Sequence, residues 1–348
     1  MYELGSRRYM TPKRRFLAAL YGGRVDRPAV GSATSVATVE LMDEMEASFP
    51  EAHLDPSVMA RLASGACEVF HMDNLMPVYS VTQEAAALGC HVNWGSSPDE
   101  MPEVRSRVCA SIDDDVKMPD DFLAKPPIRV VLDAIRLLRK DYGDHVSITG
   151  KALGPWSLAL SAYGVEEVLI ATIDKPERLA QVLRGLKEVT LLFGRAQIEA
   201  GADSLCIPDH VTADLCRPEV YSEYLLPIHF ELQQQLDCPL ILHICGHSLD
   251  RLKYIAQSGM ACFHYDTKVS AKDARRAAGD KISLMGGVNN PSTLLFGSPE
   301  AVAKEVHEAL DVGIEIIGPE CAVPLRTPNR NLKAIALAVD EYVARSEG

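Results

Sequence analysis

The sequence has no run of about 20 apolar residues, which is the length that a helix needs to cross a bilayer, and no signal-peptide pattern at its basic N-terminus. A cytoplasmic protein without a membrane span is therefore expected. The chain also has no excess of basic residues, because its formal net charge is −13. Nucleic-acid binding depends on clustered lysine and arginine, so a small substrate or a protein partner is expected instead.

The sequence also lacks the features that are typical of dinucleotide-binding domains, of multidomain chains and of secreted disulfide-bonded proteins. No glycine-rich fingerprint joins a strand to a helix, which disfavours a dinucleotide site and the doubly wound open sheet that is the alternative fold. No internal repeat or low-complexity linker divides the chain, and its 348 residues fit one α/β barrel, so we predict a single domain over residues 1–348. The nine cysteines are an odd number without a secretory signal, which predicts reduced thiols.

What the chain does contain is an alternation of short apolar runs with longer segments of helical period. The runs are continuous and rich in branched residues, as buried parallel strands are. The predicted strands are Pro28–Val30, Met76–Tyr79, Val146–Thr149, Ser204–Ile207, Leu240–His243, Cys262–Tyr265, Ile282–Met285 and Ile314–Ile317. Eight such units predict an α/β fold, a single (β/α)8 TIM barrel with an N-terminal helical extension.

The predicted helices between these strands have recognisable starts. Ser298-Pro299 and Thr327-Pro328 each place a capping hydroxyl before a proline that suits the first helical position. The helices are Pro176–Ala200, Pro218–Leu236, Leu249–Gln257, Pro299–Asp311 and Pro328–Ala344. Asn93 to Pro127 has little periodicity, which predicts a long loop excursion after the second strand.

A candidate metal site lies at the end of the fifth predicted strand. His243 and Cys245 are two residues apart, so their side chains point the same way, although a core histidine beside a buried thiol gives the same pattern. Cys321 follows the eighth predicted strand, and the loops after these two strands open onto the same barrel mouth. Two thiolates and one imidazole suit a catalytic zinc with an open fourth position, and they argue against magnesium or calcium.

Asp266 ends the intervening strand and is a candidate fourth ligand and catalytic residue. Its alternative roles are a salt bridge or a helix cap.

Motifs along nearly the whole chain carry a family resemblance. They are Val39-Glu-Leu-Met-Asp43, Pro50-Glu-Ala-His53, Ala87-Leu-Gly-Cys90, Gly201-Ala-Asp203, His243-Ile-Cys245-Gly246 and Thr327-Pro328 with Asn331. The chain resembles the uroporphyrinogen decarboxylase superfamily, and within it the zinc-dependent branch of cobalamin-linked methyltransferases, typified by methylcobalamin:coenzyme M methyltransferase. The resemblance implies zinc ligation by His243, Cys245 and Cys321. It also places Asp266 where relatives carry a glutamate that leaves the zinc when a thiol binds.

The resemblance implies a methyltransferase in which zinc activates a small thiol such as coenzyme M. The corrinoid is expected on a separate carrier protein, because the cobalamin motif Asp-x-His-x-x-Gly is absent. The reverse reaction is the alternative: the same zinc polarises the oxygen of a methoxylated aromatic, and the methyl group passes to reduced cobalt. Porphyrinogen decarboxylation is disfavoured, because no arginines follow the strand that begins at Arg27-Pro28.

A non-catalytic module that stores zinc or binds a corrinoid is the alternative outside enzymes. A structural zinc site normally has four firm protein ligands, so the arrangement of three ligands and one candidate favours catalysis.

Other side chains near predicted strand ends are candidates for the lining of the mouth, with ordinary packing as the alternative. The candidates for substrate contact are Glu84, Trp94, Trp156, Asp209 and Tyr265. Lys151 and Arg326 are candidates to hold an anionic acceptor.

Overall fold

Eight parallel strands form one sheet that curls into a nearly closed barrel, which confirms the predicted fold. The computed structural model describes residues 9–347. The strands are β1 (Ala29–Val30), β2 (Asn74–Leu75), β5 (Ser147–Lys151), β6 (Ser204–Pro208), β7 (Leu240–Ile244), β8 (Cys262–Tyr265), β9 (Ser283–Val288) and β10 (Ile316–Pro319), in the spatial order β1-β10-β9-β8-β7-β6-β5-β2. β5 to β8 are buried along their whole length, as their apolar runs predict.

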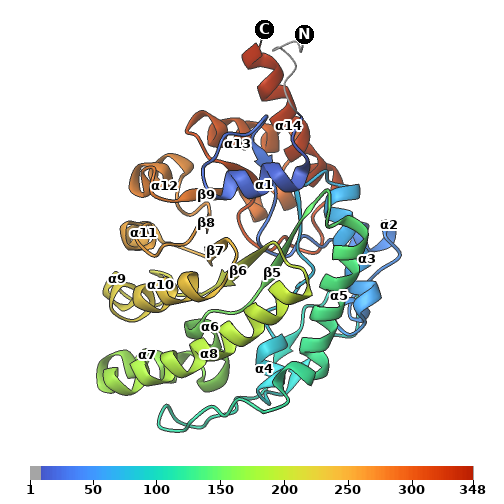
Figure 1. The fold of residues 1–348 in the computed structure, drawn as a ribbon. Coiled ribbons are helices and arrows are strands. Elements are labelled where there is room, and N and C mark those ends of the chain that lie inside the picture. The colour runs from blue at the N-terminus through green and yellow to red at the C-terminus, as the bar shows by residue number, and fades with distance from the viewer. Residues whose placement is uncertain (1–8, 348) are drawn as a thin grey trace, which may run out of the picture.

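Helices form an outer layer around the strands (Figure 1). They are α1 (Pro12–Leu20), α2 (Val39–Glu44), α3 (Pro56–Glu68), α4 (Gln83–Ala87), α5 (Pro126–Tyr142), α6 (Pro155–Tyr163), α7 (Val165–Asp174), α8 (Pro176–Ala200), α9 (Pro218–Val220), α10 (Leu226–Gln235), α11 (Leu249–Ile255), α12 (Ala271–Ala278), α13 (Pro299–Asp311) and α14 (Asn329–Glu347). The predicted helix from Pro218 is interrupted by a π-helical turn at Tyr221–Leu225. Pro227 follows this turn and cannot donate a backbone hydrogen bond, which accounts for the break.

The second strand is shorter and earlier than predicted. It covers Asn74–Leu75, so the prediction of Met76–Tyr79 is wrong, and that segment leads from the strand to the rim. The side chain of Asn74 accepts a hydrogen bond from the Ser32 amide at 3.0 Å and donates one to the Ser32 carbonyl at 2.8 Å. These bonds join β2 to the segment after β1, where backbone pairing is short. A polar side chain thus connects the two segments at a position where an apolar strand residue was expected.

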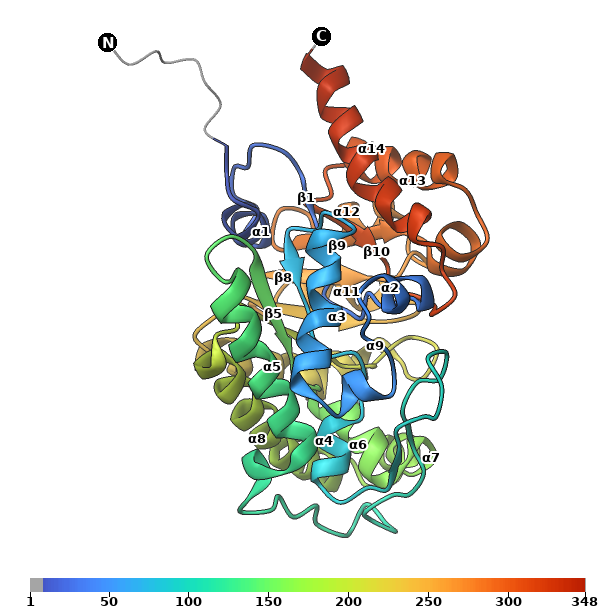
Figure 2. The same cartoon turned by 90° about the vertical axis from the view of Figure 1, so that its right-hand side faces the viewer.

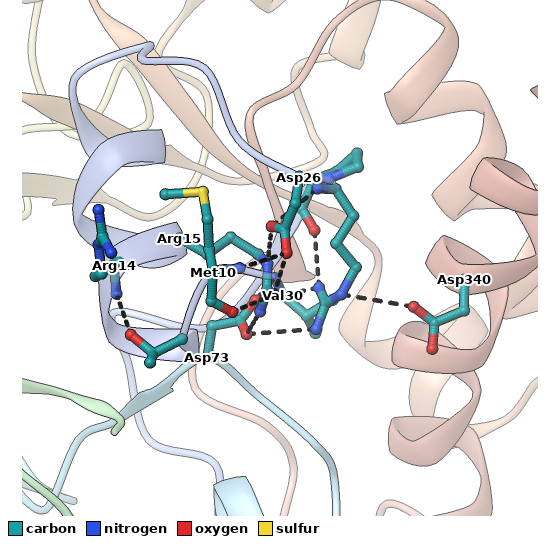
Figure 3. A network of polar contacts seen from close by, with 10 residues as sticks. Met10, Arg14, Arg15, Asp26, Val30, Asp73 and Asp340 are labelled. Atoms are coloured by element: carbon teal, nitrogen blue, oxygen red, sulfur yellow. Dashed lines mark hydrogen bonds and ion pairs between the residues drawn. The ribbon is translucent and has the colours of Figure 1, made fainter. Parts of the chain in front are cut away.

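A buried ionic network lies behind the same seam (Figure 3). Arg15 of α1 donates to Asp73 Oδ1 at 2.7 Å and to Asp26 Oδ1 at 2.7 Å, and the Val30 amide donates to Asp73 Oδ2 at 2.8 Å. Burial tends to raise the pKa of Asp26, but the hydrogen bonds from Arg15 outweigh it and lower this pKa to about 2. For Asp73 burial has the larger effect and raises the pKa, although Arg15 and Arg27 both oppose it. The network ties α1 to both strands of the seam.

The interior of the barrel is a separate apolar core, and α1 closes it from below. Phe16 and Leu20 of α1 are fully buried in it. The barrel residues in this interior core are Ala29, Ala33, Cys206, Ile241, Cys262, Met285 and Ile316. Cys206 pairs in register with Ile241, and Ile241 with Cys262, so these side chains form one layer across the barrel.

The predicted excursion is ordered by its neighbours. It begins with a two-stranded hairpin, β3 (Val92–Asn93) and β4 (Glu103–Val104), and then runs beside α6 and α7 (Figure 2). Arg178 donates to Asp115 at 2.7 Å, and the Val108 amide donates to the Ala162 carbonyl at 3.2 Å. Within residues 9–347 no single helix passes the length and hydropathy test for a membrane span, whereas α6 and α7, bent by 112° to each other, pass it only as a pair.

His53 is a buried histidine that the fold keeps neutral. Its ring stacks on Phe49 at a centroid distance of 4.1 Å, and burial, with a smaller effect from Lys151, lowers its pKa to about 3. The folded pKa lies below the unfolded value of about 6.5, so the stability from a neutral His53 is present above pH 6.5 and is lost as the pH falls.

We expect His53→Phe to flatten the acid side of the stability profile. Between pH 6.5 and 4, wild type should lose roughly 2–3 kcal/mol of unfolding free energy more than the variant. Denaturant titrations at a series of pH values measure this difference, and parallel profiles for the two proteins would contradict it.

Candidate metal centre

Three predicted ligands meet at the C-terminal rim of the barrel. His243 lies in β7, Cys245 directly follows this strand, and Cys321 follows β10. His243 Nε2 lies 2.9 Å from Cys245 Sγ and 3.4 Å from Cys321 Sγ, and the two sulfur atoms are 2.9 Å apart. Both cysteines are free thiols, since a disulfide bond would bring the sulfur atoms to about 2.05 Å. The structure thus brings Cys321 to two residues that lie 76 and 78 positions before it in the chain.

The backbone fixes the orientation of the His243 ring. His243 Nδ1 lies 3.1 Å from the His264 carbonyl oxygen. A carbonyl only accepts, so Nδ1 carries the proton and the lone pair of Nε2 faces the two thiols. This is the tautomer that a metal-binding histidine needs.

His264 connects the two strands that supply the ligands. Its ring lies 4.5 Å from the ring of His243, and its Nε2 donates to the Pro319 carbonyl at 2.8 Å. Burial holds the pKa of His264 well below the usual value, so the ring is neutral and keeps a single proton for this bond. One buried residue in β8 therefore supports His243 through its carbonyl and the start of the Cys321 loop through its side chain.

One hydrogen bond couples the two thiols. The bond from Cys245 is the main cause that lowers the pKa of Cys321, and the same bond is the main cause that raises the pKa of Cys245. A site that stabilises a sulfur anion in this way suits a cation as its ligand.

The ligand set fits zinc in chemistry and in spacing. The three ligand atoms lie within 4.8 Å of one another. Zinc bonds of about 2.0–2.3 Å in a tetrahedron put ligand atoms roughly 3.5–3.8 Å apart, so the thiols need to move by less than about 1 Å. Two sulfurs and one imidazole are also the donors that zinc prefers over magnesium or calcium.

Asp266 lies beside this cluster and not within it. Its Oδ2 accepts from the Gly246 amide at 2.8 Å, and its Oδ1 accepts from the Lys268 amide at 2.9 Å. Its charge adds to the effect of Cys321 in raising the pKa of Cys245. The carboxylate thus holds the turn after Cys245, and zinc ligation by Asp266 stays a prediction.

Glu320 is a positioning residue that the sequence reasoning missed. Its carboxylate accepts from the Thr267 amide at 2.9 Å and from the Asn290 amide at 2.8 Å, and burial raises its pKa. These bonds fasten the Cys321 loop to the ends of β8 and β9. The sequence held a signal for each of these supporting residues. Glu320 is an acidic residue directly before a candidate ligand, and His264 is a histidine inside the apolar run Cys262–Tyr265.

A cavity of about 470 Å³ leads from the rim to the three ligands. Its lining includes apolar, hydroxyl and charged side chains from the ends of several strands. Beside the three ligands these are Thr34, Ser35, Tyr79, Ser80, Val81, Met101, Pro102, Lys151, Leu153, Ser157, Leu160, Ser161, Pro208, Asp209, His210 and Ala322. The cavity is large enough for a small thiol, and His243, Cys245 and Cys321 form part of its wall.

The other predicted lining residues fall in different places. Asp209 lines the cavity and is held by the Ser157 amide at 2.8 Å and by His229 Nε2 at 2.9 Å. Glu84, Trp156 and Tyr265 are buried but do not belong to the cavity lining.

The two remaining candidates lie away from the cavity. The Trp94 ring lies 6.2 Å from the ring of His53, and Arg326 pairs with Asp99 on the exposed surface. The structure therefore groups Asp209 and Lys151 with the metal ligands and separates the other candidates from them.

Replacing His264 tests how strongly this residue, which does not itself belong to the cluster, supports the three candidate ligands. His264→Phe keeps a ring beside His243 but removes the hydrogen bond to Pro319. The carbonyl that holds His243 Nδ1 stays, and only the bond that fastens the start of the Cys321 loop is lost, so we expect zinc affinity to fall by about 10-fold, the lower end of the range for losing an outer hydrogen bond. Competition with a chelator measures this affinity, and His307→Phe, which changes an outer histidine of α13, is the matched control. An unchanged affinity would show that β8 does not support the ligands in this way.

Comparisons with known proteins show the family of the chain. The family model for uroporphyrinogen decarboxylase (URO-D) matches residues 11–342. The chain is 35% identical to a methylated-thiol–coenzyme M methyltransferase of Methanosarcina mazei, over 95% of this chain and 90% of the relative. It is 33% identical to the methylcobamide:CoM methyltransferase MtaA of Methanosarcina barkeri, over 96% of this chain and 99% of the relative. A solved methyltransferase structure from Methanosarcina mazei superposes with a TM-score of 0.92 at 33% identity, covering 96% of this chain and 99% of that one.

Proposed function

Because the chain belongs to the uroporphyrinogen decarboxylase family, and its cavity ends at a His-Cys-Cys cluster, we propose that it is a zinc-dependent methyltransferase that moves a methyl group from a corrinoid to a small thiol such as coenzyme M. A methyltransferase activity linked to corrinoids agrees with the relatives, whose names include methylcobamide:CoM methyltransferase. The observation that carries the proposal for zinc is the convergence of Nε2 of His243 with two sulfur atoms at the wall of the cavity.

The metal supplies one element of the chemistry. Zinc, when bound, keeps a thiol deprotonated near neutral pH, so that the sulfur remains nucleophilic.

The protein supplies placement. His243 keeps its ring fixed through the His264 carbonyl, and the Cys321 loop is fastened by Glu320, so the substrate sulfur meets a rigid site. The thiolate attacks the methyl carbon, a sulfur–carbon bond forms, and the cobalt–carbon bond breaks with both electrons left on cobalt. A positioned nucleophile is the main requirement of such a displacement.

We propose that the corrinoid arrives on a carrier protein. The chain lacks the cobalamin motif, and the cavity of about 470 Å³ suits a small molecule better than a corrinoid ring, so the methyl donor is expected to cover the mouth from outside.

Asp266 is proposed as an exchangeable partner of the site. Its carboxylate accepts a hydrogen bond from the amide of Gly246, the residue directly after Cys245. We therefore expect the position of this carboxylate to change when a substrate thiol binds beside Cys245.

Methyl transfer from methylcobalamin to coenzyme M tests the proposal. With zinc-loaded protein and no oxygen, we expect loss of the methylcobalamin absorption and formation of S-methylated coenzyme M in equal amounts. Zinc-free protein should be inactive until zinc is restored. If thiols gain no methyl group, but a methoxylated aromatic converts reduced cobalamin to methylcobalamin, the reverse reaction replaces this proposal.

A further inference from the structure

Lys151 lies deeper in the barrel than the metal ligands and borders the same cavity. It is the last residue of β5 and pairs in register with Cys206, whose side chain belongs to the interior core. Cys206 in turn pairs with Ile241, two residues before His243 on the same face of β7. Register partners point to the same side of a sheet, so Lys151 and His243 both point inward, one layer apart. The ammonium group thus rises from the floor of the cavity towards the ligands.

The backbone of Lys151 is held rigidly by α8. Gln197 accepts from the Lys151 amide at 2.9 Å and donates to the Lys151 carbonyl at 2.9 Å. Gln197 is itself fully buried. The lysine is therefore set in a fixed position and is not a surface side chain folded inward.

No protein group within residues 9–347 forms a hydrogen bond or a close ion pair with Nζ of Lys151, although the residue is only 4% exposed. The charge of the buried Glu84 acts on Lys151 electrostatically, but the Glu84 carboxylate accepts a hydrogen bond from the Leu153 amide at 2.8 Å. Burial lowers the pKa of Lys151 to about 8, with Cys206, Glu84 and Cys321 opposing this effect. A buried cation without a close partner is costly, so its presence beside a cavity points to a ligand with negative charge.

We infer that Lys151 binds the anionic end of the thiol substrate, so that the enzyme selects short thiols with a sulfonate or carboxylate a few carbons from the sulfur. This inference rests on the proposed function. Lys151 and the three ligands line one cavity and lie one layer apart, so a short thiol whose sulfur reaches the ligands brings its other end near Lys151. Ser35 also lines the cavity and brings a hydroxyl donor to it, whereas the hydroxyls of Ser80 and Ser161 already donate to Gln83 and to the Ser157 carbonyl.

Three thiols of similar length separate charge recognition from reactivity. They are 2-mercaptoethanesulfonate, 3-mercaptopropionate and the neutral 2-mercaptoethanol. We expect wild type to favour the better anionic thiol over the neutral one by at least about 10-fold in kcat/KM, because a hydrogen bond to a charged group is lost with the neutral molecule. The ranking of the two anions identifies sulfonate or carboxylate as the preferred group. Equal kcat/KM values for all three thiols would overturn the inference without any variant.

Lys151→Met removes the charge but keeps the length of the stem. In this variant the ratio of kcat/KM for the anionic thiol to that for the neutral thiol should fall by about 10- to 100-fold, mainly through KM. Lys151→Arg should recover part of the ratio. Lys187→Met, which removes a partly buried lysine paired with Glu231 on the outside of the barrel, is the matched control and should leave the ratio unchanged. An equal loss for all three thiols would assign Lys151 to the metal site and overturn the inference.

Binding of ethanesulfonate, which has no thiol, separates this inference from the proposed function. Calorimetry should show binding to zinc-loaded wild type and at least about 10-fold weaker binding to Lys151→Met. If no thiol is methylated but this difference is found, the methyl-transfer proposal fails and the anion site stands. If thiols are methylated but ethanesulfonate binds both proteins equally, the anion site fails and the methyltransferase stands.

Discussion

Replacing Cys245 with serine is expected to lower the zinc content of the purified protein from about one equivalent to less than about one tenth. A serine hydroxyl does not ionise near neutral pH, so the site loses one of its two anionic ligands and the partner that prepares Cys321. Methyl transfer should fall by roughly 1000-fold or more, because no deprotonated thiol is then held at the site. Metal analysis and the methylcobalamin assay measure the two effects.

Cys67→Ser is the matched control for this experiment. Cys67 is a half-buried free cysteine of α3 that lies outside the metal cluster. Its serine variant should retain zinc and activity. Full zinc content in both Cys245→Ser and Cys321→Ser would contradict the assignment of the ligands.

Asp73→Asn should cause a large loss of stability although Asp73 lies far from the metal ligands in the chain. It removes a carboxylate that is 1% exposed and leaves the buried Arg15 with a single anionic partner, Asp26. Breaking a buried ion pair from one side costs about 3–5 kcal/mol, because the remaining charge stays desolvated. The denaturant midpoint should fall accordingly, with an unchanged slope of unfolding free energy against denaturant.

Asp340→Asn provides the matched comparison within the same network. Asp340 approaches Arg27 at 3.5 Å, but its side chain is 66% exposed (Figure 3). An exposed pair contributes at most about 1 kcal/mol, so this variant should unfold close to wild type. Similar losses for the two variants would show that burial does not set the strength of this network.

The sequence predicted most of the barrel because buried parallel strands leave a clear pattern. Six strands from β5 to β10 lie where apolar runs end at turn residues. The second strand was misplaced because Asp73, directly before it, and Asn74, its first residue, are polar, and their side chains replace part of the backbone pairing. A strand that is held by side-chain hydrogen bonds in place of backbone hydrogen bonds does not show the apolar run by which the other strands were predicted.

The meeting of the three candidate ligands could be predicted from the sequence because barrel topology gathers the ends of all strands at one rim. His243, Cys245 and Cys321 needed only the strand order to be placed together. The surrounding residues could not be assigned in this way. The roles of His264 and Glu320 depend on register and on hydrogen bonds between loops, and the burial of Trp156 and Tyr265 depends on side-chain packing that no spacing reveals.

The apolar core beneath the cavity has a consequence for the order of events in catalysis. Phe16, Leu20 and the apolar side chains of the interior core fill the barrel beneath the cavity, so in the described part of the chain the rim is the route to the three ligands. The thiol and the methyl donor must then use the same entrance, and a carrier protein seated on the rim traps whatever lies below it. We expect compulsory-order kinetics, in which the thiol binds before the carrier and the methylated product leaves after it. An excess of demethylated carrier should therefore slow the escape of isotopically labelled product from the enzyme, and an unchanged escape rate would indicate a second exit.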